Sequence, residues 1–141
     1  MARNYILDQA TAAKKLQRMA FEIVENNLEE KQLILAGIRE SGSVIARIMQ
    51  QLLQQISSIK PELIQVTLDK KNPGPVTLSS SVDFNNKVIL LIDDVANSGK
   101  TLLYAMKPFL AFLPKKVQTL ALVERTHKTY PINTDYVGLS V

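Results

Sequence analysis

The sequence predicts one α/β domain built on an open, mostly parallel sheet flanked by helices. Short apolar runs alternate along the chain with longer segments whose apolar residues recur at helical spacing. The run at residues 87–92, KVILLI, is continuously apolar, as is typical of a strand that helices cover on both faces. A length of 141 residues suits one ordinary domain, and we assign residues 1–141 to it.

Apolar spacing and local stop signals give the order of the elements. Asp8 is a good N-cap for a first helix, and Pro61 marks the end of a second. A third helix should contain Pro108, which predicts a kink inside it. The predicted strands are residues 32–38, 63–68, 87–92, 117–123 and 136–141. The second helix opens at residues 41–43, and the third runs from about residue 99 to residue 113.

A long polar connection, residues 69–81, follows the second predicted strand. It contains Lys70, Lys71 and the turn signal Asn72-Pro73-Gly74. The turn lies between two short apolar runs, so the connection is expected to form an antiparallel ribbon. Such an excursion is either a lid over a ligand or a disordered segment, and the sequence leaves both readings open.

Composition excludes several function classes. The chain has no cysteine and only one histidine, His127, so thiolate metal sites and Ser-His-Asp relays are excluded. The first residues carry no apolar run typical of a secretory signal, and we expect a cytoplasmic protein. The net charge of +4 is spread over scattered basic pairs, which favours solvated faces over a nucleic-acid stripe. The chain stops at Val141 within an apolar run, which suits either a terminal strand or a missing C-terminal tail.

The most informative segment is the loop that follows the predicted strand 87–92. That strand delivers two adjacent carboxylates, Asp93 and Asp94, to the edge of the sheet. Successive backbone N–H groups of residues 96–101 can then ring a phosphate before the next helix. Gly99 permits close approach of the backbone to that phosphate. The loop therefore predicts an anion site directly beside two acids.

The two acids need a role other than holding that phosphate, because like charges repel. Accepting hydrogen bonds from a vicinal diol, with a divalent cation nearby, suits them. A phosphate and a diol one sugar apart describe a ribose phosphate. In open parallel sheets, ligands bind beyond the carboxyl ends of the strands. Residues 37–42, 93–101 and 124–128 are therefore expected to surround one crevice.

The sequence of this loop allows two other interpretations. The end of the nucleotide-triphosphate pattern G-x-x-x-x-G-K-[ST] is present, but its first glycine would fall at Asp94. An acid there opposes the wrapping of a triphosphate. Asp93 and Asp94 could instead simply cap a helix, yet capping needs one short polar residue, not two acids behind a buried strand. Ligand binding is therefore the favoured interpretation.

The same segment resembles the phosphoribosyl-pyrophosphate signature of type I phosphoribosyltransferases. The resemblance extends over nearly the whole chain to the bacterial pyrimidine-operon attenuator and uracil phosphoribosyltransferase group. Its further marks are the segments Ile6 to Asp8, Leu35 to Arg39 and Asp135 to Gly138. It implies an enzyme that joins a nucleobase, with uracil as the first candidate, to phosphoribosyl pyrophosphate. It also implies magnesium bound through that substrate, with no direct protein ligand, and a homodimer or larger homo-oligomer.

The resemblance also implies roles for individual residues. Arg39, Lys70, Asp93 and Asp94 would act in catalysis, with Lys70 carried on a mobile lid. Tyr136 would stack on the base while the Val137 backbone bonds its edge. A cis peptide bond in the loop of residues 37–42 is expected by the same resemblance. The residues implied to bind phosphoribosyl pyrophosphate are Gly37, Ile38, Arg39, Glu40, Asp93, Asp94, Ala96, Asn97, Ser98, Gly99, Lys100 and Thr101.

Some positions depart from the family pattern. Asn97 stands where purine-specific relatives carry an aspartate, which makes purine chemistry the weaker expectation. Glu40 places a negative charge beside the implied pyrophosphate site, and Ser41 occupies a position that is often basic. The alternative function is therefore a weakly catalytic or non-catalytic regulator that senses a nucleotide and binds pyrimidine-operon RNA. Lys14, Lys15 and Arg18 are its best candidates for an RNA-binding face.

Overall fold

The computed structural model describes residues 8–80 and 82–141. Ile6 and Leu7, which carry part of the family resemblance, lie outside these residues, as does Ser81 of the expected lid. In chain order the elements are α1 (Gln9–Glu25), β1 (Gln32–Ile38), α2 (Arg39–Ile56), β2 (Lys60–Leu68), β3 (Val76–Leu78), β4 (Val88–Ala96), α3 (Lys100–Ala105), the 3-10 helix η1 (Lys107–Ala111), β5 (Lys116–Glu124) and β6 (Tyr136–Ser140).

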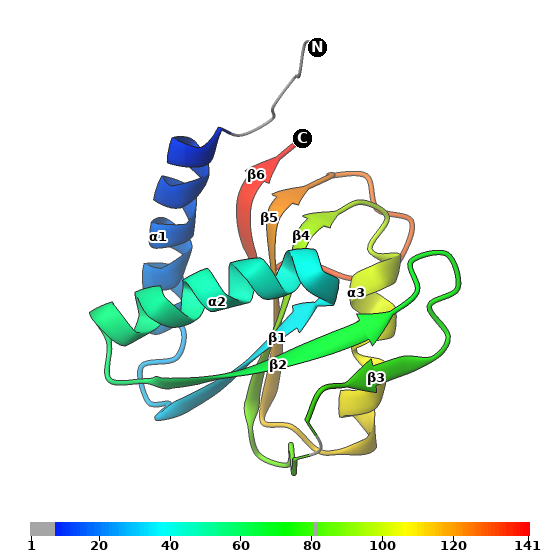
Figure 1. Cartoon of the computed structure of the whole chain (residues 1–141), viewed down its shortest axis with the longest axis horizontal. Coiled ribbons are helices and arrows are strands. Elements are labelled where there is room, and N and C mark those ends of the chain that lie inside the picture. Colours follow the sequence, from blue (N-terminus) through cyan, green and yellow to red (C-terminus); the bar gives the residue numbers. More distant parts are fainter. Residues whose placement is uncertain (1–7, 81) are drawn as a thin grey trace.

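The strands form one six-stranded sheet in the order β3-β2-β1-β4-β5-β6 (Figure 1). All neighbouring strands are parallel except β3, which pairs antiparallel with β2. This arrangement confirms the α/β fold with a mostly parallel sheet. Because β4 lies between β1 and β5, the loops that follow these three strands emerge side by side at the carboxyl edge.

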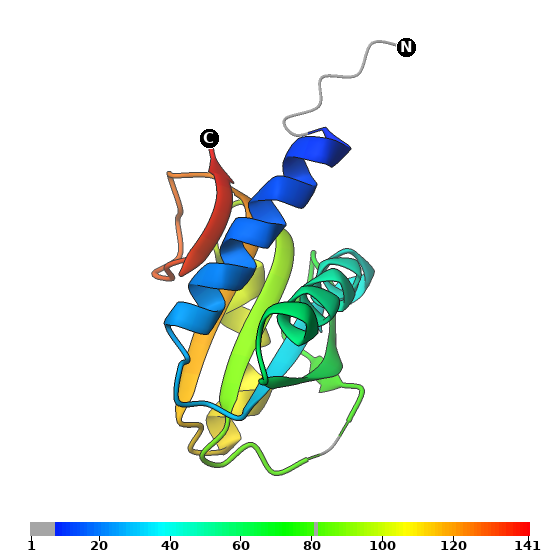
Figure 2. The same cartoon turned by 90° about the vertical axis from the view of Figure 1, so that its left-hand side faces the viewer.

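Helices cover both faces of the sheet (Figure 2). α1 and α2 pack on one face, and α3 and η1 lie on the other. The first face buries side chains such as Met19, Met49 and Leu90 in one core cluster. The second face buries another cluster, which includes Phe84 and Phe109 in an edge-to-face contact with ring centroids 4.9 Å apart.

Strands β1 and β4 are the most deeply buried strands, as their continuous apolarity predicts. Residues 33–38 of β1 and residues 88–93 of β4 are all buried. Gly42, near the start of α2, packs directly against the backbone of Ile92 at the end of that buried run. The start of α2 is thereby fixed against the point where β4 delivers its acids.

Several predicted boundaries are wrong, and packing explains the differences. α2 begins at Arg39, two residues before the expected opening, because a positive φ of 58° at Arg39 turns β1 straight into the helix. Pro61 lies inside β2 and does not mark the end of α2, which stops at Ile56. The third predicted helix is split into α3 and η1 just before Pro108, where the missing N–H prevents a continuous α-helix.

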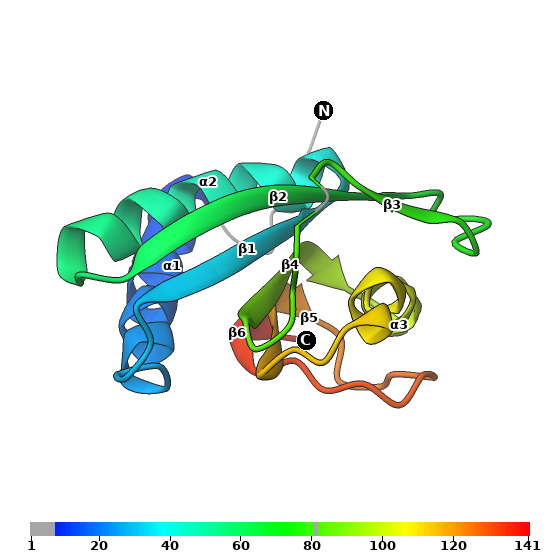
Figure 3. The same ribbon diagram turned by 90° about the horizontal axis from the view of Figure 1, so that it is seen from below.

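The expected antiparallel ribbon is present. Val66, Thr67 and Leu68 of β2 pair with Leu78, Thr77 and Val76 of β3. Figure 3 shows the ribbon and its hairpin loop reaching beyond the body of the sheet on the side of α3. The tip is tethered there, because Lys107 Nζ of η1 donates a hydrogen bond to the carbonyl oxygen of Gly74 at 2.9 Å.

Strand β6 forms one edge of the sheet, and α1 runs beside it. Arg18 Nη2 donates hydrogen bonds to the carbonyl oxygens of Val137 at 2.9 Å and Gly138 at 3.2 Å. Its other terminal nitrogen pairs with Glu22 at 3.1 Å. Arg18 therefore joins α1 to the edge strand. None of the helices in the described residues has the length and apolarity needed to cross a membrane.

Candidate functional site

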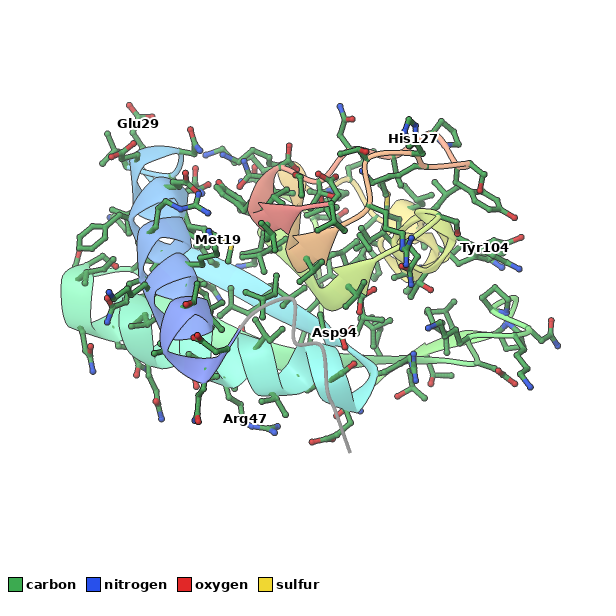
Figure 4. All side chains as sticks on the ribbon, turned by 90° about the horizontal axis from the view of Figure 1, so that it is seen from above. Met19, Glu29, Arg47, Asp94, Tyr104 and His127 are labelled. Atoms are coloured by element: carbon green, nitrogen blue, oxygen red, sulfur yellow. The ribbon has the colours of Figure 1, made fainter. Side chains whose placement is uncertain are left out.

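A pocket of about 450 Å³ lies at the carboxyl edge of the central strands. It brings together the loops after β1 and β4 and the start of the ribbon. Figure 4 shows Asp94 near the beginning of α2. The lining residues are Arg39, Ser41, Lys70, Asp93, Asp94, Val95, Ala96, Asn97, Ser98, Gly99, Lys100, Thr101 and Leu102.

Asp93 is the buried acid of the pocket. Only 5% of it is exposed, and its Oδ1 accepts a hydrogen bond from the backbone N–H of Asp94 at 2.9 Å. Burial raises the pKa of Asp93 to about 7, and the neighbouring Asp94 carboxylate adds to that rise. The positive charge of Arg39 and the backbone hydrogen bond act in the opposite direction. Asp93 is thus poised to exchange a proton near neutral pH.

Asp94 is half-buried beside it. Its Oδ1 accepts a hydrogen bond from the backbone N–H of Val95 at 2.8 Å. Each acid therefore uses one oxygen on the next backbone N–H, which fixes both side chains against the start of the loop. The remaining oxygens can accept further hydrogen bonds or contact a cation.

The loop after Asp94 turns tightly at Gly99, whose φ is 87°. A Cβ at Gly99 would lie 2.6 Å from Cγ2 of Ile132, so this position requires glycine for space as well as for conformation. The Ser98 carbonyl oxygen accepts hydrogen bonds from the backbone N–H groups of Thr129 at 3.1 Å and Tyr130 at 3.0 Å. The segment after β5 therefore buttresses the loop from outside the pocket.

The same loop has backbone donors that are available to a ligand. Among the described residues, the backbone N–H groups of Ser98 and Gly99 have no hydrogen-bond partner. The N–H of Lys100 reaches only the Ser98 hydroxyl, at 3.3 Å. N–H groups that converge in such a turn form a concave anion site. The geometry is that expected of a phosphate-binding loop.

The loop after β1 carries a strained residue at its centre. Arg39 has a positive φ of 58°, which a non-glycine residue rarely adopts. Its carbonyl oxygen accepts a hydrogen bond from the Ser43 hydroxyl at 2.7 Å. The expected cis peptide bond is absent, since every peptide bond in the described residues is trans. The strain falls on the backbone of Arg39, and strained residues of this kind cluster at ligand sites.

Not every residue of that loop reaches the pocket. Gly37 and Ile38 are buried beneath the start of α2, where a Cβ at Gly37 would lie 2.6 Å from the Cα of Ser43. The Glu40 side chain is 75% exposed and pairs with Arg47 at 3.3 Å. Glu40 is absent from the pocket lining, so its charge is directed elsewhere. The site uses Arg39 and Ser41 from this loop.

The structure contradicts the expected stacking of Tyr136 on a base. Tyr136 is the first residue of the edge strand β6, where it pairs with Leu120 of β5, and it is 2% exposed. Its ring packs in the core cluster under α1 and α2, and its hydroxyl donates to Gln118 Oε1 at 2.9 Å. The Val137 carbonyl is occupied by Arg18. Neither residue lines the pocket, and the prediction for Tyr136 is wrong because its side chain points into the core.

Sequence reasoning missed Arg125, which follows β5. The pairing of Ala96 with Glu124 places the ends of β4 and β5 side by side. Beyond that pair, Arg125 Nε donates to Asn97 Oδ1 at 3.0 Å. Asn97 lines the pocket and Arg125 is not among the lining residues, so this bond places Arg125 next to the pocket wall on the β5 side. The sequence already predicts that residues 93–101 and 124–128 lie around one crevice, and this expectation could have pointed to Arg125.

The family of the chain follows from comparison with known proteins. The family model described as "Phosphoribosyl transferase domain" matches residues 3–141. The chain belongs to this family, and it is a phosphoribosyltransferase. The pocket formed by Arg39, the two acids and the loop to Thr101 is the part of the fold in which such chemistry is expected.

Three curated proteins are similar to this chain over all or nearly all of its length. "Bifunctional protein PyrR" of Lactococcus lactis subsp. cremoris is 32% identical, over all of this chain and 84% of its own length. The protein of the same name from Alkaliphilus metalliredigens is 35% identical, over 97% of this chain and 81% of its own length. A "Pyrimidine operon regulatory protein" of Lactococcus lactis subsp. lactis is 32% identical over the whole of this chain and 84% of its own.

Solved structures support the fold. A hypoxanthine-guanine phosphoribosyltransferase of Bacillus anthracis superposes with a TM-score of 0.81 at 17% identity, covering 100% of this chain and 84% of its own. The hypoxanthine phosphoribosyltransferase of Trypanosoma cruzi superposes with a TM-score of 0.85 at 11% identity, covering 99% of this chain and 82% of its own. At these identities the likeness shows the fold alone.

Proposed function

We propose that this chain transfers the 5-phosphoribosyl group from phosphoribosyl pyrophosphate to a nucleobase, with uracil as the first candidate. One observation carries the proposal: a single pocket combines two acids, a loop whose Ser98 and Gly99 backbone N–H groups have no partner among the described residues, and the cations Arg39, Lys70 and Lys100. Each group of the substrate has a chemical counterpart in that set. The curated relative whose name refers to pyrimidines, the "Pyrimidine operon regulatory protein", supports the choice of base.

The phosphate and the ribose occupy the part of the pocket that β4 supplies. The backbone N–H groups of Ser98 and Gly99 donate to the 5-phosphate, with the side chains of Ser98 and Thr101 as further donors. The carboxylates of Asp93 and Asp94 accept hydrogen bonds from the two ribose hydroxyls. The negative charge of Asp94, and that of Asp93 when it is ionised, also favours the positive charge that develops on the sugar as the bond to the leaving group breaks.

The leaving pyrophosphate lies on the β1 side of the pocket. Arg39 and Lys70 line that part and donate to its oxygens. Among the described residues, no group of three or more acidic, histidine or cysteine side chains is placed to hold a metal ion. Asp93 and Asp94 offer the hard oxygen atoms that magnesium prefers, so an ion entering with the substrate fits beside them. When bound, magnesium neutralises the charge of the departing pyrophosphate.

The transfer is a single displacement at C1 of the ribose. The ring nitrogen of the base forms the new bond to C1 with its lone pair, and the bond from C1 to the pyrophosphate oxygen breaks. The electron pair of that bond leaves with pyrophosphate, and the proton of the ring nitrogen passes to solvent. Since entering and leaving groups lie on opposite faces of an inverting sugar, the base approaches from the β5 side.

The test is calorimetric titration of phosphoribosyl pyrophosphate with magnesium, followed by an assay of pyrophosphate release with each nucleobase. Binding with release for one base alone would establish the transferase and identify its substrate. Binding without release for any base would reject the proposed transfer and favour a ligand-sensing role. No binding at all would exclude both.

A regulator that binds pyrimidine-operon RNA is the second candidate. The curated relatives named as operon regulatory proteins favour it, and Lys14 is exposed on α1. Arg18 contributes less than expected, because its guanidinium is committed to Val137, Gly138 and Glu22. Filter binding with pyrimidine leader RNA over a range of salt concentrations tests this candidate. Absence of a salt-dependent affinity would exclude it.

We also propose that the protein works in the cytoplasm as a homodimer or larger homo-oligomer. Support for assembly comes from exposed apolar side chains on the outer helices, since Phe21 is 56%, Val44 43% and Ile48 39% exposed. Light scattering of the purified chain measures the assembly directly. A monomer at micromolar concentration would contradict it.

A further inference from the structure

The sheet order fixes the side from which a base reaches the sugar. This argument rests on the proposed function, in which pyrophosphate leaves beside Arg39 in the loop after β1. β4 separates β1 from β5 in the sheet. A base that enters opposite the leaving group therefore meets the residues that follow β5.

Two residues at the ends of β4 and β5 form a fixed pair on that side. The backbone N–H of Arg125 donates to the Ala96 carbonyl oxygen at 2.9 Å. The Arg125 side chain then bends back over the end of β4, where its Nε donates to Asn97 Oδ1 at 3.0 Å. Asn97 belongs to the pocket wall. Backbone and side-chain contacts together hold the guanidinium at the rim.

The other cation close to this pair, Lys128, is already held in an ion pair with Glu124. Both side chains are only 13% exposed. Burial alone would raise the pKa of Glu124, yet its hydrogen bonds from Lys128 and Ser140 and the charge of Lys128 help to leave that pKa below the usual value. Glu124 is thus a charged partner that keeps Lys128 at the base of the loop. Of these two cations after β5, Arg125 is the one that bonds Asn97 of the pocket wall.

The pair formed by Arg125 and Asn97 offers a ligand hydrogen-bond donors only. Asn97 uses its oxygen on Arg125, so its amide nitrogen remains as a donor. Within the described residues, the two terminal nitrogens of Arg125 have no hydrogen-bond partner. A guanidinium and an amide NH₂ offer donors only. A carbonyl oxygen of a base would satisfy them, whereas an exocyclic amino group would place donor against donor.

We infer that Arg125, held against Asn97, is a specificity-determining residue for the base and selects a ring with a carbonyl oxygen at this edge. Uracil and cytosine both carry a carbonyl oxygen at ring position 2 and differ at position 4, so we place position 4 against Arg125. There a 2,4-dioxopyrimidine presents the required oxygen, and a 4-amino-2-oxopyrimidine presents an amino group. A site whose polar groups are left unpaired by the wrong ligand discriminates strongly against it. Asn97 acts as a positioning residue through its bond to the guanidinium.

The test compares ligands that differ only in the base. Calorimetry measures the affinities of uridine 5′-monophosphate, cytidine 5′-monophosphate and ribose 5-phosphate for the intact chain and its variants. We expect Arg125→Ala to weaken uridine monophosphate binding by about tenfold or more, the loss of a hydrogen bond to a charged group. Ribose 5-phosphate affinity should stay unchanged, and the preference for the uridine over the cytidine nucleotide should disappear.

Three further variants keep the result interpretable. Arg125→Gln retains a side chain of similar length without the charge, and it takes the place of Arg125→Ala if that variant does not fold. Asn97→Ala should reduce the same preference, because the guanidinium loses its support. Lys115→Ala is the control, since it removes an exposed cation that pairs with Glu30 beyond the opposite end of β5. It should bind all three ligands as the wild type does.

The outcomes separate this inference from the proposed function. If ribose 5-phosphate binds but Arg125→Ala leaves the uridine and cytidine affinities unchanged, the role of Arg125 is wrong while the phosphate and diol sites stand. An equal loss for ribose 5-phosphate would also overturn it, because Arg125 would then act on the whole pocket. Absence of ribose 5-phosphate binding to the wild type would overturn the proposed function and this inference together.

Discussion

Gly42 of α2 lies against the carbonyl oxygen of Ile92 at the end of the buried run of β4, closer than any side chain allows. A Cβ on Gly42 would also stand 3.5 Å from the Cα of Asp93. The loop after β1 and the acids after β4 are therefore held together by direct backbone packing. This contact joins the two halves of the pocket.

Replacing Gly42 by alanine should damage both stability and the site. The added methyl group forces α2 away from β4, and overpacking of this kind costs about 1–3 kcal/mol of unfolding free energy. Chemical denaturation measures the loss. Gly74→Ala is the matched control, because its Cβ would meet only Asn72 Oδ1 at 3.9 Å. Equal stability of the two variants would contradict the close approach described here.

Asp94→Asn should weaken the binding of phosphoribosyl pyrophosphate by about 10- to 100-fold, as expected for a lost hydrogen bond to a charged group. The fold should be unaffected, because Asp94 is half-buried and an amide oxygen can still accept the bond from Val95. Titration calorimetry with magnesium present gives the affinity. An unchanged affinity would remove the diol-binding role from this acid.

Asp93 should make stability fall as the pH rises. Its pKa is about 7 in the folded chain and near 3.8 when unfolded, so the folded state keeps a proton that the unfolded state releases between these values. Unfolding free energy should decrease across that window by at most about 4 kcal/mol, at about 1.36 kcal/mol per pKa unit. Below a pH of about 3.8, the stabilising contribution of the Asp93 proton to the unfolding free energy is fully present.

Asp93→Asn supplies the control for that titration. An amide cannot lose its proton, so the variant should show a much flatter dependence of stability on pH between 4 and 7. Denaturation curves at a series of pH values compare the two chains. Identical slopes would show that Asp93 is not the titrating group.

Lys107→Ala should loosen the tip of the ribbon without weakening the fold. The substitution removes the hydrogen bond between Lys107 Nζ and the Gly74 carbonyl oxygen. Trypsin cleaves after Lys70 or Lys71, both exposed near that tip. We expect cleavage to become about three to ten times faster, corresponding to about 1 kcal/mol for one hydrogen bond. Unchanged cleavage would mean that the ribbon is held by its strand pairing alone.

Tyr136→Phe tests the placement of that ring in the core. The variant loses the hydrogen bond to Gln118 Oε1 and should be destabilised by about 1 kcal/mol. The KM for the base should not change, because Tyr136 is 2% exposed and lies away from the pocket. A raised KM with unaltered stability would instead support a stacking role.

The fold was largely predictable because its strongest signals are local. Continuous apolarity identified the buried strands β1 and β4, and Asp8 did cap α1, with its Oδ1 accepting from the Thr11 N–H at 2.7 Å. The turn signal Asn72-Pro73-Gly74 correctly predicted the antiparallel ribbon of β2 and β3. The two acids and the glycine-bearing loop that follows them predicted one wall of the pocket. This was possible because all these residues are consecutive in the chain.

The parts that were missed depend on contacts between distant residues. Whether Tyr136 faces the core or a ligand is set by its register with Leu120, which the sequence of β6 alone does not specify. The contact of Arg125 with Asn97 joins two loops 28 residues apart. Strain at Arg39 likewise arises from how α2 packs on β4, because nothing in the local sequence requires a positive φ there.

The bond of Arg18 to β6 has a consequence for solubility. An exposed edge strand is a template to which strands of other molecules can add, and such pairing starts aggregation. Arg18 occupies the carbonyl oxygens of Val137 and Gly138. Because successive carbonyl groups of a strand point to opposite sides, one of these two faces the open edge to which a strand would add. α1 thus shields that edge. Arg18→Ala should leave the pocket intact while making the protein more prone to form ordered aggregates.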